Sequence, residues 1–465
     1  MSDAEENESQ VVIIGGGLAG LASAWYLQKK NISYTLIESS DRFGGLIESL
    51  HDDGNVVEFG PDSFITRKPW ALELVRDLDI DDELIFVNKT QERIYIYLNN
   101  KLVPLPDGLR LLIPTKIIPF LFSSIMTLRG KFRLLLDLVI PRKNIDIDES
   151  VESFVTRRFG REALINIAEP ILGGVYNSEM STQSILSSFP QFKIMEKNHG
   201  SLIRGMRKTT NMQSEQQSYE KGFASLKQGM DSLISTLVKS LKGKLILESE
   251  VIEIQKNNSI KLKNGKSINF EYLIIATQAN TTSKLLENIN KDTSKLLGQI
   301  RYESVGCVSF VFNENDIPQS INSHGVVVPG ISNKNIDGIQ FSSYKWNGRV
   351  QTGKVLIRGF FGGPNTREIL EEKDELILEK VLEDIKNILN ITTTPLNSYL
   401  KKWINSYPQY DINHASLILK IKNNLPSNIK ISGNAYHGIG MPDTVNSAKR
   451  AAEEIEIDIK ENEKL

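Results

Sequence analysis

The sequence predicts an α/β protein, α+β overall, that combines a discontinuous Rossmann-like domain with a mixed-sheet domain and a helical subdomain. Three observations predict this class. Residues 11–45 give an apolar strand, a glycine turn, an alanine-rich helix and a second strand. Strand patterns return over 245–275, after a helical pattern over 145–190. The segment 432–455 then goes back to a glycine turn and a helix. A parallel sheet built from distant segments is therefore expected.

The first strand–helix–strand unit carries glycines at a fixed spacing. Gly15 suits the tight turn after the strand, Gly17 lets backbone approach a diphosphate, and Gly20 lets the helix pack closely on the sheet. The helix would then point its first N–H groups and its positive dipole end at the diphosphate. Glu38 ends the second strand, where a carboxylate can accept the two ribose hydroxyls. The unit is predicted to bind a dinucleotide.

The residues after Glu38 distinguish between dinucleotides. They continue with Ser39 and reach Arg42, Gly44 and Gly45. This ExxxRxGG order resembles the stretch that wraps the FAD diphosphate in the family of amine oxidases, phytoene desaturases and protoporphyrinogen oxidases. NAD dehydrogenases usually lack it, so FAD is the expected cofactor.

Composition narrows the class of protein. The chain has 465 residues, 40% hydrophobic and 24% charged, and a formal net charge of −2. This length allows two or three domains. The charge argues against a nucleic-acid partner, because phosphate binding needs a basic face.

The single cysteine, Cys307, excludes an intrachain disulfide and lies outside every flavin motif, so a non-covalent cofactor is expected. The five histidines show no ligand spacing, and no metal site is expected. The acidic start MSDAEENES does not read as a signal peptide, and no apolar run of 18 residues predicts a membrane span. A cytoplasmic protein is expected.

Residues 101–143 carry eight Lys or Arg against two acids, with apolar runs between them. Two interpretations remain open. The segment is either a helical subdomain with a solvated basic rim, or a surface that lies on the inner face of an anionic membrane.

Several longer motifs resemble the oxygen-dependent protoporphyrinogen and coproporphyrinogen III oxidases of haem biosynthesis, from about residue 11 to 455. They are EFGPDSFITRKPWALELVRDLDI (58–80), AEPILGGVYNSEMSTQSILSSFPQF (168–192), HGSLIRGM (199–206), WINSYPQYDINH (403–414) and SGNAYHGIGMPDTVNSAKRAAEEI (432–455). Departures are Asn413 for the usual Gly before His, Asn177 and Ser178 for a small pair, and Ala448 for a common Gly. The first two leave the shape of the substrate chamber open.

The resemblance implies a set of cofactor contacts. Residues 58–80 would cover the flavin, Val251 would present backbone groups to the adenine, and 432–455 would hold the flavin ring. The complete predicted set is Gly15, Gly17, Leu18, Ala19, Gly20, Glu38, Ser39, Arg42, Gly44, Gly45, Gly60, Pro61, Asp62, Ser63, Val251, Gly433, Gly440, Met441, Pro442 and Asp443. Independently, Gly438 and Gly440 let backbone approach a ring, and Asp443 is expected to cap the helix that follows.

The implied reaction removes six electrons from a porphyrinogen in three two-electron cycles, with O₂ reduced to H₂O₂. A chamber for a flat macrocycle with propionates needs apolar walls and a few cations. Lys68 and Arg93 are the preferred cations, ahead of Arg67 and Arg204. The aromatic candidates for the walls are Phe310, Phe312, Tyr344, Phe360 and Phe361. No residue set suggests a catalytic base, and none is assigned.

Other readings stay open. An amine oxidase or a carotenoid desaturase would keep the FAD motifs with a different chamber, and a non-catalytic flavin-binding subunit would keep everything except turnover. A homodimer and a partner enzyme of the haem pathway are both compatible with the resemblance. The expected division assigns 10–95, 221–290 and 425–465 to the FAD-binding domain, and 191–220 and 291–424 to the substrate domain. Residues 96–190 form the helical subdomain, for which membrane association is one of the two open interpretations.

Overall fold

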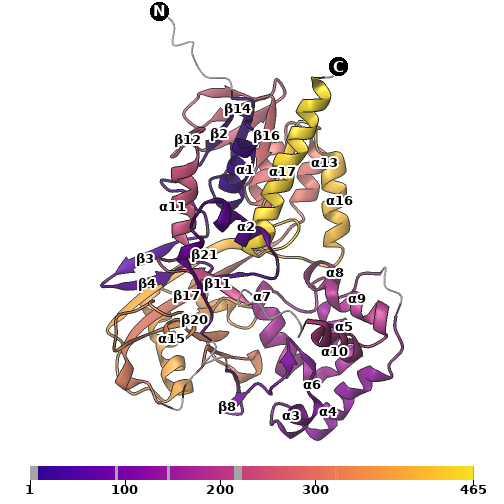
Figure 1. The fold of residues 1–465 in the computed structure, drawn as a ribbon, viewed down its shortest axis with the longest axis vertical. Helices are drawn as coiled ribbons and strands as arrows, with labels where there is room; N and C mark the ends of the chain where they lie inside the picture. The colour runs from indigo at the N-terminus through magenta and orange to yellow at the C-terminus, as the bar shows by residue number, and fades with distance from the viewer. Residues whose placement is uncertain are drawn as a thin grey trace, which may run out of the picture.

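The computed structural model describes residues 9–88, 93–143, 147–213, 222–319, 321 and 323–463. Figure 1 shows three parts: a sheet with long helices near both chain termini, a second sheet beneath it, and a group of helices beside the second sheet. The predicted class, α/β with a discontinuous nucleotide-binding sheet, a mixed sheet and a helical subdomain, is confirmed.

The first sheet has five parallel strands and is assembled from both ends and the middle of the chain. Its order is β12 (Lys244–Ile246), β2 (Tyr34–Ile37), β1 (Val11–Ile14), β16 (Tyr272–Ile275) and β22 (Ile429–Ile431). The glycine turn follows the C-terminal end of β1 and therefore lies at the carboxyl edge of the sheet, in its centre.

Alternate residues of β1 serve two cores. Val11 and Ile13 pack with α1 (Leu18–Lys29), α11 (Asp231–Ser240) and α17 (Met441–Asn462). Val12 and Ile14 pack with a three-stranded antiparallel sheet of β13 (Val251–Gln255), β14 (Ser259–Leu262) and β15 (Ser267–Asn269). A strand buried on both faces has the continuous apolar sequence seen at 11–14.

The second sheet is mixed and has seven strands. Its order is β21 (Asn397–Pro408), β17 (Tyr302–Asn313), β20 (Lys354–Phe361), β19 (Gly338–Phe341), β18 (Gly325–Val327), β7 (Ile94–Leu98) and β8 (Lys101–Pro104). The pair β18 and β7 is parallel, and the other neighbours are antiparallel. One face is covered by α15 (Asp374–Leu389), whose Ile377, Val381 and Ile385 lie in the same apolar core as β17.

The helical subdomain contains α3 (Ile117–Phe122), α4 (Leu128–Leu135), α5 (Val151–Phe159), a π-helix (Leu164–Gly173), α8 (Ile185–Ser188), α9 (Pro190–His199) and α10 (Leu202–Gln213). The polar composition of 198–220 predicts a loop, and this prediction is wrong for Leu202–Gln213, which form α10 with Leu202 and Ile203 buried in the helical core. The rest of that loop, 214–221, lies outside the described residues. The domain boundaries themselves stay a prediction.

Two departures from the family pattern join the helical subdomain to the rest of the molecule. Asn177 has a left-handed backbone and donates from its amide to the carbonyls of Ser304 and Gly362, both at 3.2 Å. Asn413 is also left-handed, with φ 71°, and its N–H donates to Asp148. Asparagine tolerates this conformation better than other non-glycine residues, which explains how Asn413 can stand at the position where the resemblance expects glycine.

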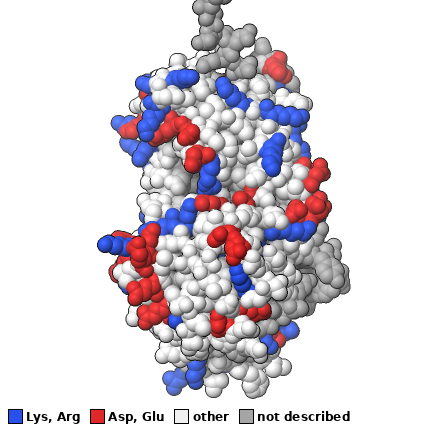
Figure 2. All heavy atoms as spheres, turned by 90° about the vertical axis from the view of Figure 1, so that its left-hand side faces the viewer, with Lys and Arg blue, Asp and Glu red and all other residues white. Residues whose placement is uncertain are grey.

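Charge is spread over the surface. Figure 2 shows Lys and Arg interspersed with Asp and Glu among broad uncharged areas on the face it presents. In the part of the chain that the structure describes, no helix is both long enough and apolar enough to cross a membrane.

Candidate flavin and substrate site

The predicted phosphate turn has room for a ligand at Gly17. A Cβ placed on Gly17 would meet nothing nearer than Gly45 Cα at 3.8 Å, whereas one on Gly20 would lie 1.8 Å from Gly15 O. Gly20 therefore allows helix–strand packing, and Gly17 faces open space. No side chain caps Gly17, which precedes α1, so the start of that helix carries no acidic or hydroxyl acceptor of its own.

The Arg-x-Gly-Gly loop lies directly against this turn. Gly44 N–H donates to Gly16 O at 2.8 Å, and a Cβ on Gly45 would be 3.2 Å from Gly17 Cα. Arg42 donates to the carbonyls of Gly45 at 2.6 Å and Ile47 at 3.1 Å. Arg42 therefore holds the backbone of the loop through these two carbonyls. Its contact with a diphosphate stays a prediction.

Glu38 closes the turn from the second strand. One carboxylate oxygen accepts the Gly16 N–H at 2.6 Å, and the other accepts the N–H and hydroxyl of Ser40, both at 2.8 Å. The Ser39 hydroxyl donates to this second oxygen as well, at 3.2 Å, so all of the roughly four acceptor positions of the carboxylate are filled. Ribose hydroxyls would have to replace the exposed hydroxyls of Ser39 and Ser40. A cavity of about 430 Å³ begins beside it, lined by Ser39, Asp41, Glu248, Ser249, Glu250, Leu262, Lys263 and Asn264. Val251 follows this lining and is buried in β13, where the adenine is expected.

The turn Gly60–Pro61–Asp62–Ser63 packs on the same loop. A Cβ on Gly60 would be 1.8 Å from Leu46 O, so only glycine fits there. The Asp62 side chain points toward the mixed sheet. It accepts from the Gln340 amide at 2.6 Å, the Trp346 indole at 2.8 Å and the Lys345 ammonium at 3.2 Å.

Charge holds this carboxylate ionised. Burial by itself would raise the pKa of Asp62, but the nearby Lys345 and Arg358 and the Trp346 indole hold that pKa far below its usual range. Arg358 is itself buried and donates to Gly60 O at 3.1 Å. The mixed sheet therefore anchors the predicted flavin-covering turn at two points. Sequence reasoning missed these anchors, although a lone arginine in the apolar strand VLIRGFF is a signal that could have found one of them.

The last part of the site is the loop before α17. Gly433 and Gly438 have φ of 142° and 137°, and Gly440 precedes the helix with no side-chain cap. The expected capping role of Asp443 is wrong. It is the third residue of α17, and both its carboxylate oxygens accept from Lys68, at 2.7 and 2.6 Å. Met441 and Pro442 are buried in the first helical turn.

The remaining substrate candidates are the exposed arginines and the predicted aromatic wall residues. Arg93 is exposed just before β7, and Arg67 and Arg204 are exposed as well. Phe310, Phe312 and Phe361 lie in the core beneath α15, which places them away from a substrate wall. Phe360 is on the opposite face of β20, with the Arg358 guanidinium 4.9 Å from its ring. Tyr344 stacks on Phe341 at 5.5 Å.

These residues fit a bound flavin dinucleotide. Two helices, α1 and α17, begin at glycine residues without side-chain caps. The first begins at Gly17, where there is open space, and the second at Gly440, where a Cβ would lie 3.4 Å from Asp443 Oδ2. Glu38, the residue predicted to bind the ribose, lies between the first turn and the 430 Å³ cavity. Cys307 is buried in β17, and its thiol donates a weak hydrogen bond to Phe59 O. The thiol therefore lies inside the protein with a hydrogen-bond partner.

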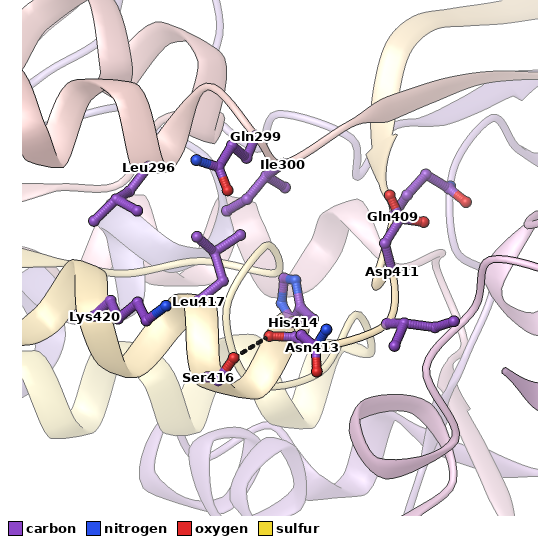
Figure 3. Close-up of a pocket in the computed structure, with 11 residues that line it drawn as sticks. Leu296, Gln299, Ile300, Gln409, Asp411, Asn413, His414, Ser416, Leu417 and Lys420 are labelled. Atoms are coloured by element: carbon purple, nitrogen blue, oxygen red, sulfur yellow. Dashed lines mark hydrogen bonds between the residues drawn. The ribbon is translucent and has the colours of Figure 1, made fainter. Parts of the chain in front are cut away.

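A second cavity, of about 400 Å³, lies between α13 (Lys291–Leu297) and α16 (His414–Asn424). Figure 3 shows Leu296 and Ile300 on one side and Leu417 and Lys420 on the other, with His414 at the start of α16. It contains none of the residues predicted to bind cofactor or substrate. Among the described parts of the chain, no group of His, Cys, Asp and Glu is arranged to hold a metal ion.

Fold and site together define a flavin-dependent oxidoreductase. The model of the family "Flavin containing amine oxidoreductase" matches residues 18–456, and the chain belongs to this family. It is 33% identical to the coproporphyrinogen III oxidase of Bacillus subtilis, over 97% of this chain and 98% of that protein. It is 30% identical to the coproporphyrinogen III oxidase of Staphylococcus aureus, over 96% and 98%.

Solved structures agree. A provisionally named protoporphyrinogen oxidase from Exiguobacterium sp. 255-15 superposes with a TM-score of 0.85 at 27% identity, covering 96% of this chain and 98% of that one. The resemblance predicted from the motifs, and the flavin cofactor, are confirmed.

Proposed function

We propose that the protein is an FAD-dependent coproporphyrinogen III oxidase of haem biosynthesis. The observation that carries the proposal is the match, over nearly the whole chain, to two enzymes of that name. The site supports it, because the glycine turn before α1, Glu38 at the end of β2 and the glycine loop before α17 have the chemistry that a diphosphate, a ribose and a flavin ring would need. The protoporphyrinogen oxidase name of the Exiguobacterium relative keeps protoporphyrinogen IX as the second candidate substrate.

Bound FAD would take two electrons from the macrocycle in each of three cycles and pass them to O₂, giving one coproporphyrin III and three H₂O₂ from one coproporphyrinogen III and three O₂. The protein's own task is to hold and orient. The first turn of α1 would bind the diphosphate, Glu38 the ribose, and the start of α17 the ring. The turn 60–63, fixed by Arg358 and Trp346, would set the floor against which the macrocycle lies.

The substrate carboxylates need cations, and we propose Lys68 and Arg93 for this role. Lys68 already binds Asp443, yet an ammonium has three N–H donors and one can turn to a propionate. Arg93 is exposed and its guanidinium is accessible. Coproporphyrinogen III carries four propionates and protoporphyrinogen IX two, so these residues would discriminate in favour of the former.

The test is aerobic incubation with each porphyrinogen, read by porphyrin fluorescence and steady-state kinetics. The proposal expects a higher kcat/KM for coproporphyrinogen III. Arg93→Met or Lys68→Met should raise KM for the four-propionate substrate roughly tenfold, if a charge-assisted pair worth about 1.5 kcal/mol is lost, and less for the other substrate. Lys256→Met is the control, because Lys256 is an exposed cation directly after β13 and is not among the candidate cations. A preference of the unmodified enzyme for protoporphyrinogen IX would reverse the substrate assignment, and absence of turnover on both would refute the function.

We also propose a cytoplasmic location with peripheral contact to the inner face of the membrane. Five large apolar side chains of the α3–α4 region are more than two-thirds exposed: Ile118, Phe122, Leu128, Phe132 and Val139. Six of the eight cations in 101–143 are exposed, among them Lys116 directly before α3 and Arg129 in α4. The other two have internal roles, since Lys131 donates to Leu121 O and Arg133 to the carbonyls of residues 156–158. An apolar patch with a basic rim suits anionic lipid. A homodimer and a haem-pathway partner stay proposals.

A further inference from the structure

The PQY motif places a buried tyrosine beside the loop that precedes α17. Tyr410 follows the end of β21 and is 1% exposed. Its hydroxyl accepts the Gly438 N–H at 2.6 Å and donates to Asn434 O at 2.8 Å. One hydroxyl thus closes both ends of the segment 434–438, which lies between β22 and α17.

The phenol can make both bonds only while it is neutral. Burial raises the pKa of Tyr410 well above its usual value, so the proton needed for donation to Asn434 is retained at every working pH. The Tyr410 ring also packs against two other rings. It stacks on His414 at 4.1 Å, with 13° between the ring planes, and Tyr176 of the helical subdomain lies 5.7 Å away. Figure 3 shows His414 at the first turn of α16, the helix from which it supports this stack.

The loop held by Tyr410 packs directly on the first turn of α17. A Cβ on Gly438 would lie 2.4 Å from Asp443 Cγ, so loop and first helical turn are in close contact. Any displacement of Gly438 therefore moves the end of α17 at which the flavin ring is expected. On the other side, Ser184 of the helical subdomain donates its N–H to Tyr410 O at 2.8 Å.

We propose that Tyr410 is a positioning residue that fixes the flavin-ring loop through its hydroxyl, and so sets the affinity for FAD and the reduction potential of the bound flavin. Its contacts with Tyr176 and Ser184 connect that loop to the helical subdomain. The inference rests on membership of the flavin family and is independent of which porphyrinogen is oxidised, so its failure would leave the proposed function standing.

The experiment compares Tyr410→Phe with Tyr176→Phe. Both remove one buried phenol hydroxyl and keep the ring, but the Tyr176 hydroxyl donates to Ser188 O inside the helical subdomain. Tyr410→Phe is expected to raise the dissociation constant for FAD about tenfold, since two hydrogen bonds to the loop are lost. If reduced flavin is weakened tenfold more than oxidised flavin, the midpoint potential falls by about 30 mV. Tyr176→Phe should keep both values within a factor of two of the unmodified protein, a margin well below the loss of one hydrogen bond.

Equal dissociation constants and potentials for folded Tyr410→Phe and the unmodified protein would overturn the proposal. A second measurement needs no variant. Hydrogen exchange on the unmodified protein, with and without FAD, should show the Gly438 amide protected even without FAD, because Tyr410 rather than the cofactor holds it. Rapid exchange at Gly438 in the FAD-free protein would overturn the proposal as well.

Discussion

Lys68 and Asp443 are 375 positions apart in the chain, and the ammonium of one lies 2.6 and 2.7 Å from the two carboxylate oxygens of the other. The pair joins the segment after the predicted flavin-covering turn to the first turn of the last helix. The Asp443 side chain is 11% exposed and that of Lys68 is 41% exposed. The Asp443 carboxylate is thus largely buried, and the Lys68 ammonium that neutralises it is partly exposed to solvent.

This pairing predicts that Lys68 controls the flavin as well as the substrate. Reduced flavin is negative near N1 and O2, and an unpaired Asp443 beside it would repel that charge. Lys68→Met should lower the midpoint potential of the bound flavin, by about 30 mV for each tenfold loss in relative affinity for the reduced form. Anaerobic reductive titration measures it. The double variant Lys68→Met/Asp443→Asn should recover most of the loss, and a potential that stays low in the double variant would contradict the charge explanation.

Gly17 and Gly20 should respond to substitution in different ways. Gly17 has an ordinary φ of −71° and open space before it, so Gly17→Val should fold and lose FAD, because the new side chain occupies the diphosphate position. Gly20→Ala would place Cβ 1.8 Å from Gly15 O and should destabilise the fold itself. Thermal unfolding together with the flavin released on denaturation separates the outcomes. A Gly17→Val protein with full flavin content would show that the cofactor lies elsewhere.

The exposed patch on α3 and α4 should bind vesicles that contain anionic lipid, and high salt should release it. Phe122 is 88% exposed, so Phe122→Asp should leave stability unchanged while lowering the vesicle partition coefficient tenfold or more, by loss of about 1.5–3 kcal/mol of apolar burial. Flotation measures binding. Ile331→Asp, at a side chain that is 68% exposed outside this segment, is the control. If the two variants bind the vesicles equally well, the patch does not bind membrane and is only part of the surface of the helical subdomain.

His414 should contribute to acid sensitivity. Burial lowers its pKa from 6.5 to about 4. The unfolded chain therefore binds a proton more readily than the native protein between these values, and stability is lost as pH falls from about 6.5 toward 4, on the order of 3 kcal/mol in full. His414→Phe keeps a ring against Tyr410 and should flatten the dependence of the unfolding free energy on pH in that window, measured by urea denaturation. His51→Gln, at an exposed histidine, should keep the slope of the unmodified protein, and identical slopes for all three would remove His414 from the explanation.

Local pattern was sufficient for the parts of the site that are contiguous in sequence. The unit β1–α1–β2 was predictable because strand, turn and helix each have their own periodicity and the glycine spacing reports one backbone shape. The helix from Leu202 to Gln213 was not, because its polar residues are typical of a loop and only its burial of Leu202 and Ile203 reveals a helix.

Contacts between residues far apart in the chain could not be predicted from the sequence, for a different reason. Asp443 has the composition and position of a capping residue, and nothing local indicates that Lys68 competes for its carboxylate. Asp62 was expected at the flavin, yet its side chain is bound by Gln340 and Trp346, almost three hundred residues later. Such partners are set by the packing of the two sheets, and no spacing rule encodes them.

The strand order of the parallel sheet has a consequence for how the protein is made. The sheet is complete only when β22, at Ile429–Ile431, pairs with β16, and α1 gains its cover only when α17 packs on it. During synthesis, most of the chain must therefore leave the ribosome before the N-terminal phosphate turn has a finished scaffold. A chain cut anywhere before residue 429 should keep the glycine fingerprint and still fail to retain the cofactor, so loading of FAD is an event of the completed polypeptide.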